Sequence, residues 1–330
     1  MTEDQPAQKT QPDGTTTPSE SLTRKGVVWF YVVQCVLLIL LFILGIVTGE
    51  YGYSLFYGLP FSIGVTVGAY TVRFKTRRLL KGTLITMAVL IGISTLLLIG
   101  GLDGSICIIL ALLVIVLPAV LGTVIGLWIR NVHHIYIGLL VVLFNSSFMA
   151  YDYVDNTQIE STAIESVTIH ASKEKIWHVL THGVKFRPNN NMFFEAGVNY
   201  PTSMELQYAS PSKCYLICTL NNGNASLEVE RFDSLERIRF SVPEETQSMK
   251  ELSPYDSVHA RHLEGYFKAT YGEFRIEEIS PSQCRLVATT AYTYNITPAF
   301  YWEFWTDYLV NTMHRHVLND IKTLAEENPL

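Results

Sequence analysis

The chain has 330 residues, of which 48% are hydrophobic and only 16% are charged, and its formal net charge is −6. Soluble domains usually carry about 25% charged residues, so part of this chain is expected to lie outside water. Residues 1–158 carry a net charge of +1 and residues 159–330 a net charge of −7. The acidic second half argues against nucleic acid as a partner, because phosphate contacts need clustered Lys and Arg.

The N-terminal residues 1–25 are rich in Thr, Pro, Gln and Ser and contain no apolar run. Such a segment cannot bury enough surface to offset the entropy lost on ordering. It is also too long and too mixed in charge for the first part of a signal peptide. We therefore expect a disordered tail.

Five apolar stretches follow, at about 26–48, 52–72, 82–101, 105–129 and 134–151. The first four have no Asp, Glu, Lys or Arg in their cores and approach the ~20 residues that a membrane-spanning helix needs. The fifth is shorter and is interrupted by Asn145, Ser146 and Ser147. The pattern predicts a transmembrane domain over 26–151 with about five spans.

The charges of the connecting loops predict an orientation. Basic residues precede the first span, crowd the loop between the second and third, and follow the fourth. The other two loops carry only Glu50 and Asp103, and the last exit carries Asp152 and Asp155. By the positive-inside rule, we expect a multi-pass protein of the cell (inner) membrane, with a cytoplasmic N-terminus. Everything after the last span then lies on the outer, or periplasmic, side.

Small residues and missing charges bear on the role of the spans. Gly64-xxx-Gly68 and Gly122-xxx-Gly126 have the spacing that lets helices approach closely, and they offer a possible homo-oligomer contact. No carboxylate, Lys or Arg lies deep in a span, which argues against transport through a charge relay. The missing charges do not argue against a channel for neutral species.

A linker over 152–161 is expected to lead into a soluble α/β domain over 162–327. Alternating residues predict a strand at 164–171, and Ser172 is placed to cap a helix that follows. About six further strands are expected, because 202–209, 213–221, 227–232, 236–242, 273–277 and 284–292 alternate in the same way. A long amphipathic helix begins near Thr297-Pro298. Its apolar residues step by three and four, at Trp302, Trp305, Leu309, Met313, Val317, Ile321 and Leu324.

Three passages carry a resemblance to a known superfamily. They read VTIHASKEKIWHVL, ELSPYDSVHARHLEGYFKATYGEFRI and TPAFYWEFWTDYLVNTMHRHVLNDIK. With this order of elements, the domain resembles the START-like helix-grip superfamily (SRPBCC), which includes polyketide cyclase and lipid-transfer proteins. The last two passages resemble a bacterial, membrane-tethered subgroup that is largely uncharacterised. The resemblance implies an α+β domain in which a curved antiparallel sheet surrounds the long C-terminal helix, with an apolar cavity between them. It supplies no reaction, because this fold hosts binders and enzymes alike.

The start of the last helix supplies the first candidate site residues. Trp302 and Trp305, flanked by Tyr301 and Tyr308, either line a ligand cavity or fill the core. Aromatic side chains with a polar tip suit an apolar ligand that has one or two polar groups. Positions from Val317 onward are expected to pack in solid core.

The loop before the predicted strand at 273–277 supplies the remaining candidates, Tyr255, His259 and His262, as residues at the rim of the pocket. Two histidines, even with Glu264 nearby, are too few for zinc. His314 and His316 lie two apart on a helix and so point to different sides. We therefore predict no metal site. The Asn189–Asn191 run either closes over the cavity or forms a plain solvated turn, and we favour the turn.

The sequence contains no GxSxG, Walker, GxGxxG or HExxH motif, and it predicts neither a catalytic residue nor a cofactor. The leading hypothesis is a membrane-tethered, non-enzymatic module that holds a hydrophobic small molecule or lipid. One alternative is a cyclase- or hydrolase-type enzyme that uses a pocket His or Tyr as general acid or base. Another is a membrane-embedded transport or assembly component with a regulatory outer domain. Whether Cys284 pairs with Cys214 or Cys218 in a disulfide stays open.

Overall fold

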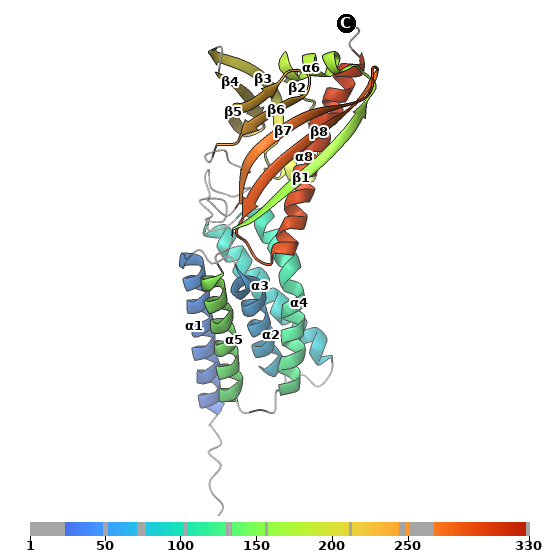
Figure 1. Cartoon of the computed structure of the whole chain (residues 1–330). Coiled ribbons are helices and arrows are strands. Elements are labelled where there is room, and N and C mark those ends of the chain that lie inside the picture. Colours follow the sequence, from blue (N-terminus) through green and yellow to red (C-terminus); the bar gives the residue numbers. More distant parts are fainter. Residues whose placement is uncertain are drawn as a thin grey trace, which may run out of the picture.

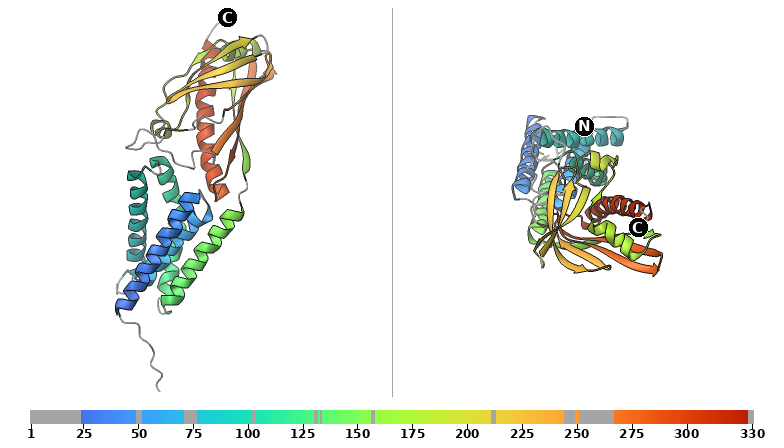
Figure 2. Two further views of the ribbon diagram at one scale, coloured as in Figure 1. Left: turned by 90° about the vertical axis from the view of Figure 1, so that its left-hand side faces the viewer. Right: turned by 90° about the horizontal axis from the view of Figure 1, so that it is seen from above.

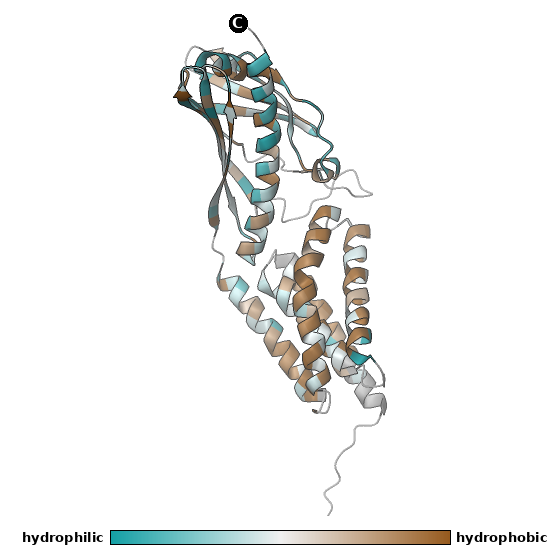
Figure 3. Ribbon diagram, turned by 90° about the vertical axis from the view of Figure 1, so that its right-hand side faces the viewer, coloured by the Kyte–Doolittle hydropathy of each residue, from teal (hydrophilic) through white to brown (hydrophobic). Residues whose placement is uncertain are grey.

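The computed structural model describes residues 24–48, 52–70, 77–101, 104–129, 132, 134–155, 158–210, 213–243, 249–250 and 267–327. These residues form a helical bundle and an α/β domain that stands on one end of it (Figure 1). Residues of high hydropathy are concentrated in the bundle (Figure 3).

In the part of the chain that the structure describes, the bundle comprises five α-helices and one short π-helical turn. They are α1 (Arg24–Thr48), η1 (Ser54–Gly58), α2 (Leu59–Tyr70), α3 (Arg78–Ile99), α4 (Ser105–Ile129) and α5 (His134–Val154). Within the described residues, three helices are long and apolar enough to cross a membrane: α3, α4 and most of α5. The apolar parts of α1 and of η1 with α2 cover only Val32–Gly45 and Ser54–Ala69. The predicted count of about five spans is therefore not confirmed.

Helices α2 and α4 approach each other through their glycines. A Cβ atom added to Gly64 would collide with the Ala119 carbonyl oxygen, and one added to Gly122 would collide with the Phe61 carbonyl oxygen. Gly68 and Gly126 make equally close approaches. The two Gly-xxx-Gly motifs thus face each other within one chain, and this contact already uses the surface suggested for a second copy.

Polar side chains connect the helices inside the bundle. Gln34 Nε2 on α1 donates to Thr66 Oγ1 on α2 at 2.8 Å, and Asn145 Nδ2 on α5 donates to Ser62 Oγ on α2. These buried amides and hydroxyls bond to one another, as polar groups between membrane helices commonly do.

Asp152 lies in the last turn of α5 and is buried, although the sequence places it in the linker. Its Oδ1 accepts a hydrogen bond from the Tyr53 backbone N–H at 2.9 Å, and its Oδ2 accepts one from the Ser54 N–H at 2.8 Å. The carboxylate therefore satisfies N–H groups that the start of η1 leaves without helical partners.

The described residues of the α/β domain form eight strands and three helices. They are β1 (Ile159–Ile169), α6 (Lys173–Thr181), β2 (Val184–Lys185), α7 (Met192–Glu195), β3 (Pro201–Ser210), β4 (Lys213–Leu220), β5 (Gly223–Asp233), β6 (Arg237–Ser241), β7 (Phe267–Ser280), β8 (Gln283–Tyr294) and α8 (Ala299–Glu327). The strands form one antiparallel sheet in the order β1-β8-β7-β6-β5-β4-β3-β2. The six expected strands after the first helix are present, and the two-residue β2 precedes them. Ser172 is the N-cap residue of α6, but its hydroxyl makes no capping hydrogen bond.

The sheet curves around α8, the helix-grip arrangement that the resemblance implied (Figures 1 and 2). The solid core lies around the second half of α8, where Val317, Leu318 and Ile321 are fully buried against α6 and the sheet. This confirms the expected core role of Val317 and Ile321. The first half of α8, from Ala299 to Met313, contains no fully buried side chain.

Candidate ligand site at the base of the grip helix

One face of α8 lies against the sheet, and hydrogen bonds hold it there. Glu303 Oε1 accepts from the Ser161 hydroxyl of β1 at 2.7 Å, and Asp307 Oδ1 accepts from the Tyr292 hydroxyl of β8 at 2.7 Å. Desolvation of the buried phenol raises the pKa of Tyr292, and its hydrogen bond to Asp307 raises it further. Both carboxylates of the lower half of α8 are thus turned to the sheet.

A second face of α8 carries the predicted site aromatics. The Trp302 ring lies 5.2 Å from the Phe56 ring of η1, and the Trp305 ring lies 6.1 Å from the Phe193 ring of α7. The Tyr301 hydroxyl donates to the Leu110 carbonyl oxygen of α4 at 2.6 Å. This face packs against η1 and α4 at the end of the bundle and against α7, which precedes β3. It does not pack against the sheet.

We call the group around Trp302 and Trp305 the basal aromatic cluster. It joins α8 to the first two turns of α4 and to the segment from α7 to β3. Its members are Trp302, Trp305, Leu309 and Met313 of α8, Ile106 and Leu110 of α4, and Phe193, Phe194, Val198 and Tyr200.

The apolar stripe that the sequence predicts along α8 contains Trp302, Trp305, Val317 and Ile321, but only Val317 and Ile321 pack in the core between α8 and the sheet. Each step of four residues turns an α-helix by about 400°, so a row of such steps drifts by about 40° per step. Three such steps separate Leu309 from Ile321. Along them, the line of apolar side chains turns around α8 from the side that faces the bundle to the side that faces the sheet. Tyr308 lies on a third, exposed side.

Several polar atoms along α8 are buried without any hydrogen-bond partner. They are Trp302 Nε1, Trp305 Nε1, Asn311 Oδ1, His314 Nδ1 and His316 Nε2. Leaving a buried donor or acceptor unsatisfied costs about 1–3 kcal/mol, and such groups call for an explanation when they occur in a native structure. Here they gather along the partly packed half of α8 and at its border with the solid core.

The two histidines of α8 occupy different environments, as the sequence predicts. His314 Nε2 shares a hydrogen bond of 2.8 Å with the Thr290 hydroxyl of β8, while the His316 ring lies 5.6 Å from the Tyr200 ring. Burial lowers the pKa of His314 to about 4. Burial also lowers the pKa of His316, against the opposing charge of Asp320. The described residues contain no group of three His, Cys, Asp or Glu that could hold a metal ion.

Hydrogen bonds hold the segment from Arg187 to Phe193, which borders the basal aromatic cluster, against α8. Buried Asp320 accepts hydrogen bonds from the Arg187 backbone N–H at 2.7 Å and from its guanidinium at 2.6 and 2.8 Å. Asn189 Oδ1 accepts from the Asn191 N–H at 3.0 Å, and Asn191 Oδ1 accepts from the Phe193 N–H at 2.9 Å. The Asn run is therefore a capping turn that starts α7 and presents its phenylalanines to α8.

The remaining predicted site residues, Tyr255, His259 and His262, lie outside the described residues, so their place at a pocket rim stays a prediction. All five cysteines are free. The sequence analysis did not single out Glu303, Asp307, Arg187 or Asp320. The spacing of Glu303 and Asp307, one helical turn apart in an otherwise apolar stretch, was a usable signal for two carboxylates that bond to the sheet.

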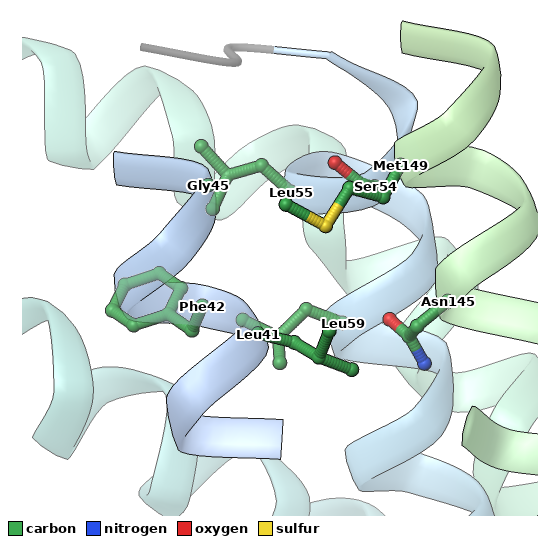
Figure 4. A pocket seen from close by; sticks show the side chains of 8 residues that line it. All are labelled: Leu41, Phe42, Gly45, Ser54, Leu55, Leu59, Asn145 and Met149. Atoms are coloured by element: carbon green, nitrogen blue, oxygen red, sulfur yellow. The ribbon is translucent and has the colours of Figure 1, made fainter. Parts of the chain in front are cut away.

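A cavity of about 30 Å³ lies inside the bundle, between α1, η1, α2 and α5 (Figure 4). Its walls are apolar apart from Ser54 and Asn145, whose amide oxygen lies on the cavity side. A volume of this size holds a water molecule or two. It is too small for a lipid and is separate from the basal aromatic cluster.

No family model matches the chain, and no curated protein matches it. Solved structures that are similar to about half of it include truncated norcoclaurine synthase from Thalictrum flavum, with 11% identity, 52% of this chain and 98% of that chain covered, and a TM-score of 0.33. The Zhui aromatase/cyclase from Streptomyces sp. R1128 has 15% identity, 51% and 94% coverage, and a TM-score of 0.31. A conserved protein of unknown function from Enterococcus faecalis has 13% identity, 52% and 84% coverage, and a TM-score of 0.26.

At such low identities and TM-scores these likenesses carry no argument about the chemistry of this chain. The fold assignment rests on the strand order and on the long helix that the curved sheet encloses. By that architecture, the described residues between Ile159 and Glu327 have a helix-grip fold.

Proposed function

We propose that this chain is a membrane-tethered binding protein for a hydrophobic small molecule or lipid, held at the base of α8. The observation that carries the proposal is the pair of buried indole N–H groups, Trp302 Nε1 and Trp305 Nε1. Neither makes a hydrogen bond of normal geometry, although the Tyr301 hydroxyl interacts with the Trp305 indole, and both belong to the basal aromatic cluster.

The chemistry of this cluster defines the ligand class. Its aromatic and aliphatic side chains favour an apolar body, which gains about 25 cal/mol for each Å² removed from water. The two indole N–H groups favour an acceptor oxygen, such as a carbonyl or ester oxygen of a lipid. An amphiphile with an apolar body and a neutral acceptor meets both requirements.

The position of the cluster supports the same ligand class. Ile106 and Leu110 belong to α4, one of the helices apolar enough to span a membrane. A ligand that partitions into the bilayer therefore has a short path to the cluster. In the orientation that the basic loops predict, this site lies at the outer membrane surface. External labelling of a cysteine introduced at Ser248 checks that orientation.

One observation favours an enzyme instead. His314 is buried and neutral, and its Nδ1 has no partner, so it has the form of a general base. Catalysis by a general base is most efficient when its pKa lies near the operating pH. A pKa of about 4 makes His314 a weak base, and binding remains the better-supported function.

The test is native mass spectrometry of the full chain after purification from membranes in mild detergent. We expect a co-purified lipid or small amphiphile. In a Trp302→Phe, Trp305→Phe variant, which keeps two rings but removes both N–H donors, retention of that ligand should fall at least about fivefold, the effect of losing about 1 kcal/mol.

Trp177→Phe is the matched control, because Trp177 packs on Phe232 in a different part of the domain and its replacement should leave retention unchanged. A parent chain that carries no ligand after incubation with a total lipid extract would contradict the proposal, as would equal retention in the double variant.

A further inference from the structure

The outward side of the first turns of α8 is exposed and apolar. Phe300, Phe304 and Tyr308 lie four residues apart, on one side of the helix, and are 70%, 62% and 39% exposed. Met192 at the start of α7 is 71% exposed, and its neighbour Phe193 places its ring 5.7 Å from that of Tyr308. Grouped exposed side chains of this size mark an interaction surface on a soluble domain.

Along the described helix α8, no charge interrupts this surface before Arg315. The only charged residues between Ala299 and Met313 are Glu303 and Asp307, and their carboxylates bond to the Ser161 and Tyr292 hydroxyls on the sheet side. The first outward charge is that of Arg315, about 16 Å farther along the helix than Phe304. The outward side of α8 therefore becomes more polar with distance from the bundle, from the two phenylalanines through Tyr308 to Arg315.

The surface is continuous with the apolar exterior of the bundle. Tyr301, one residue from Phe300, bonds through its hydroxyl to the Leu110 carbonyl oxygen in the second turn of α4. Ile109 and Leu113, which flank Leu110 on α4, are exposed large hydrophobic residues. The base of α8 thus lies beside the first turns of α4, a helix that is apolar enough to cross a membrane.

We propose that Phe300 and Phe304 enter the surface of the phospholipid bilayer and that Tyr308 lies at the level of the headgroups. Aromatic side chains are favoured at this depth, where an apolar ring and a polar tip meet the two sides of the interface. The anchor fixes the height of the grip domain over the membrane. It uses a different side of α8 from the basal aromatic cluster, and it holds whether or not that cluster binds a ligand.

The test uses the full chain in phospholipid nanodiscs, with the photoreactive benzoylphenylalanine in place of Phe304. Two control positions are used. Arg315 is on the same side of α8 but farther from the bundle, and Ile279 is an exposed apolar residue on β7. We expect a covalent phospholipid adduct at Phe304 with at least about tenfold higher yield than at either control.

The unsubstituted chain provides a second measurement that needs no altered residue. A phospholipid with a diazirine near the top of its acyl chain should label the peptide that contains Phe300 and Phe304. Equal lipid yields at Phe304 and Arg315, or absence of label on that peptide, would overturn the proposal. A Phe304 adduct to a second copy of the chain would also overturn it, since the surface would then be a protein interface.

Discussion

His314 lies at the position along α8 where partly exposed side chains give way to fully buried ones. Toward the bundle, from Ala299 to Met313, every side chain of the helix keeps some exposure, whereas Val317, Leu318 and Ile321 beyond it are fully buried. The imidazole itself is buried, with one ring nitrogen bonded to the Thr290 hydroxyl and the other without a partner. Its environment disfavours the charged form, and desolvation is the cause of its lowered pKa.

This burial predicts a pH dependence of stability. The pKa of His314 falls from the ordinary 6.5 to about 4 on folding, so below pH 6.5 the unfolded chain binds more protons than the folded chain. Its contribution to stability is therefore complete above about pH 6.5 and is lost as the pH falls toward 4. Between pH 7 and pH 5 the loss amounts to roughly 2 kcal/mol.

Urea unfolding of the parent and of His314→Gln at several pH values measures this effect. The difference between the two chains isolates His314, because both share every other titrating group. The parent should lose more free energy of unfolding on acidification than the variant does. His182→Gln, at an exposed position of the domain, controls for loss of an imidazole at the surface. Parallel pH profiles for parent and His314→Gln would contradict the prediction.

At the scale of single elements, the contact of α2 with α4 depends on the absence of side chains. The backbone of each helix occupies the space where a Cβ atom of the other would stand, at Gly64 and Gly122 among others. Gly92 on α3 has nothing within 4 Å of its added Cβ atom, so it is a glycine of the same bundle without this constraint.

Gly122→Ala should therefore destabilise the chain, by the ~1–3 kcal/mol typical of an overfilled interior. Gly92→Ala should leave stability unchanged or raise it, because alanine favours a helix by up to ~1 kcal/mol over glycine. Thermal unfolding of both variants in the same detergent compares them. Similar melting temperatures for the two would mean that close approach of α2 and α4 does not hold the bundle together.

The elements differ in how far the sequence predicts them. The strands were predictable because Leu227 and Val229 alternate with charged residues, a pattern that a half-buried strand requires. The orientation of α8 was not, because its apolar residues cover more than one side. The side that meets the sheet is set by Glu303 and Asp307, whose partners come from β1 and β8. Hydropathy likewise placed Asp152 outside the last helix, because a hydropathy scale treats a carboxylate as exposed. It does not take into account the two backbone N–H groups that bond to this carboxylate and offset the cost of burying it.

The candidate site was half predictable for the same reason. Trp302, Trp305 and Tyr301 stood out as aromatic residues on an amphipathic helix, and they do gather in one region. Their neighbours Phe193 and Leu110 are more than a hundred residues away in the chain, and no local pattern links them. Contacts between the bundle and the domain follow from tertiary packing alone.

At the scale of the whole molecule, the base of α8 joins the grip domain to the helical bundle, and the two ends of α8 are packed differently. The solid core around Val317 and Ile321 is built within the grip domain, from α6, α8 and the sheet. The base of α8 instead packs against η1 through Trp302 and against α4 through Tyr301. The domain is thus complete at one end and depends on the bundle at the other.

Separating the domain should expose this difference. In a fragment of residues 158–330, we expect the amides of Val317 and Ile321 to exchange as slowly as in the full chain, because their contacts stay within the fragment. Amides near Trp302 and Trp305 should exchange at least about tenfold faster, since their segment loses η1 and α4 and opens more readily. Equal protection along all of α8 would mean that the sheet alone holds its base. Loss of protection at Ile321 as well would mean that the bundle completes the core of the domain.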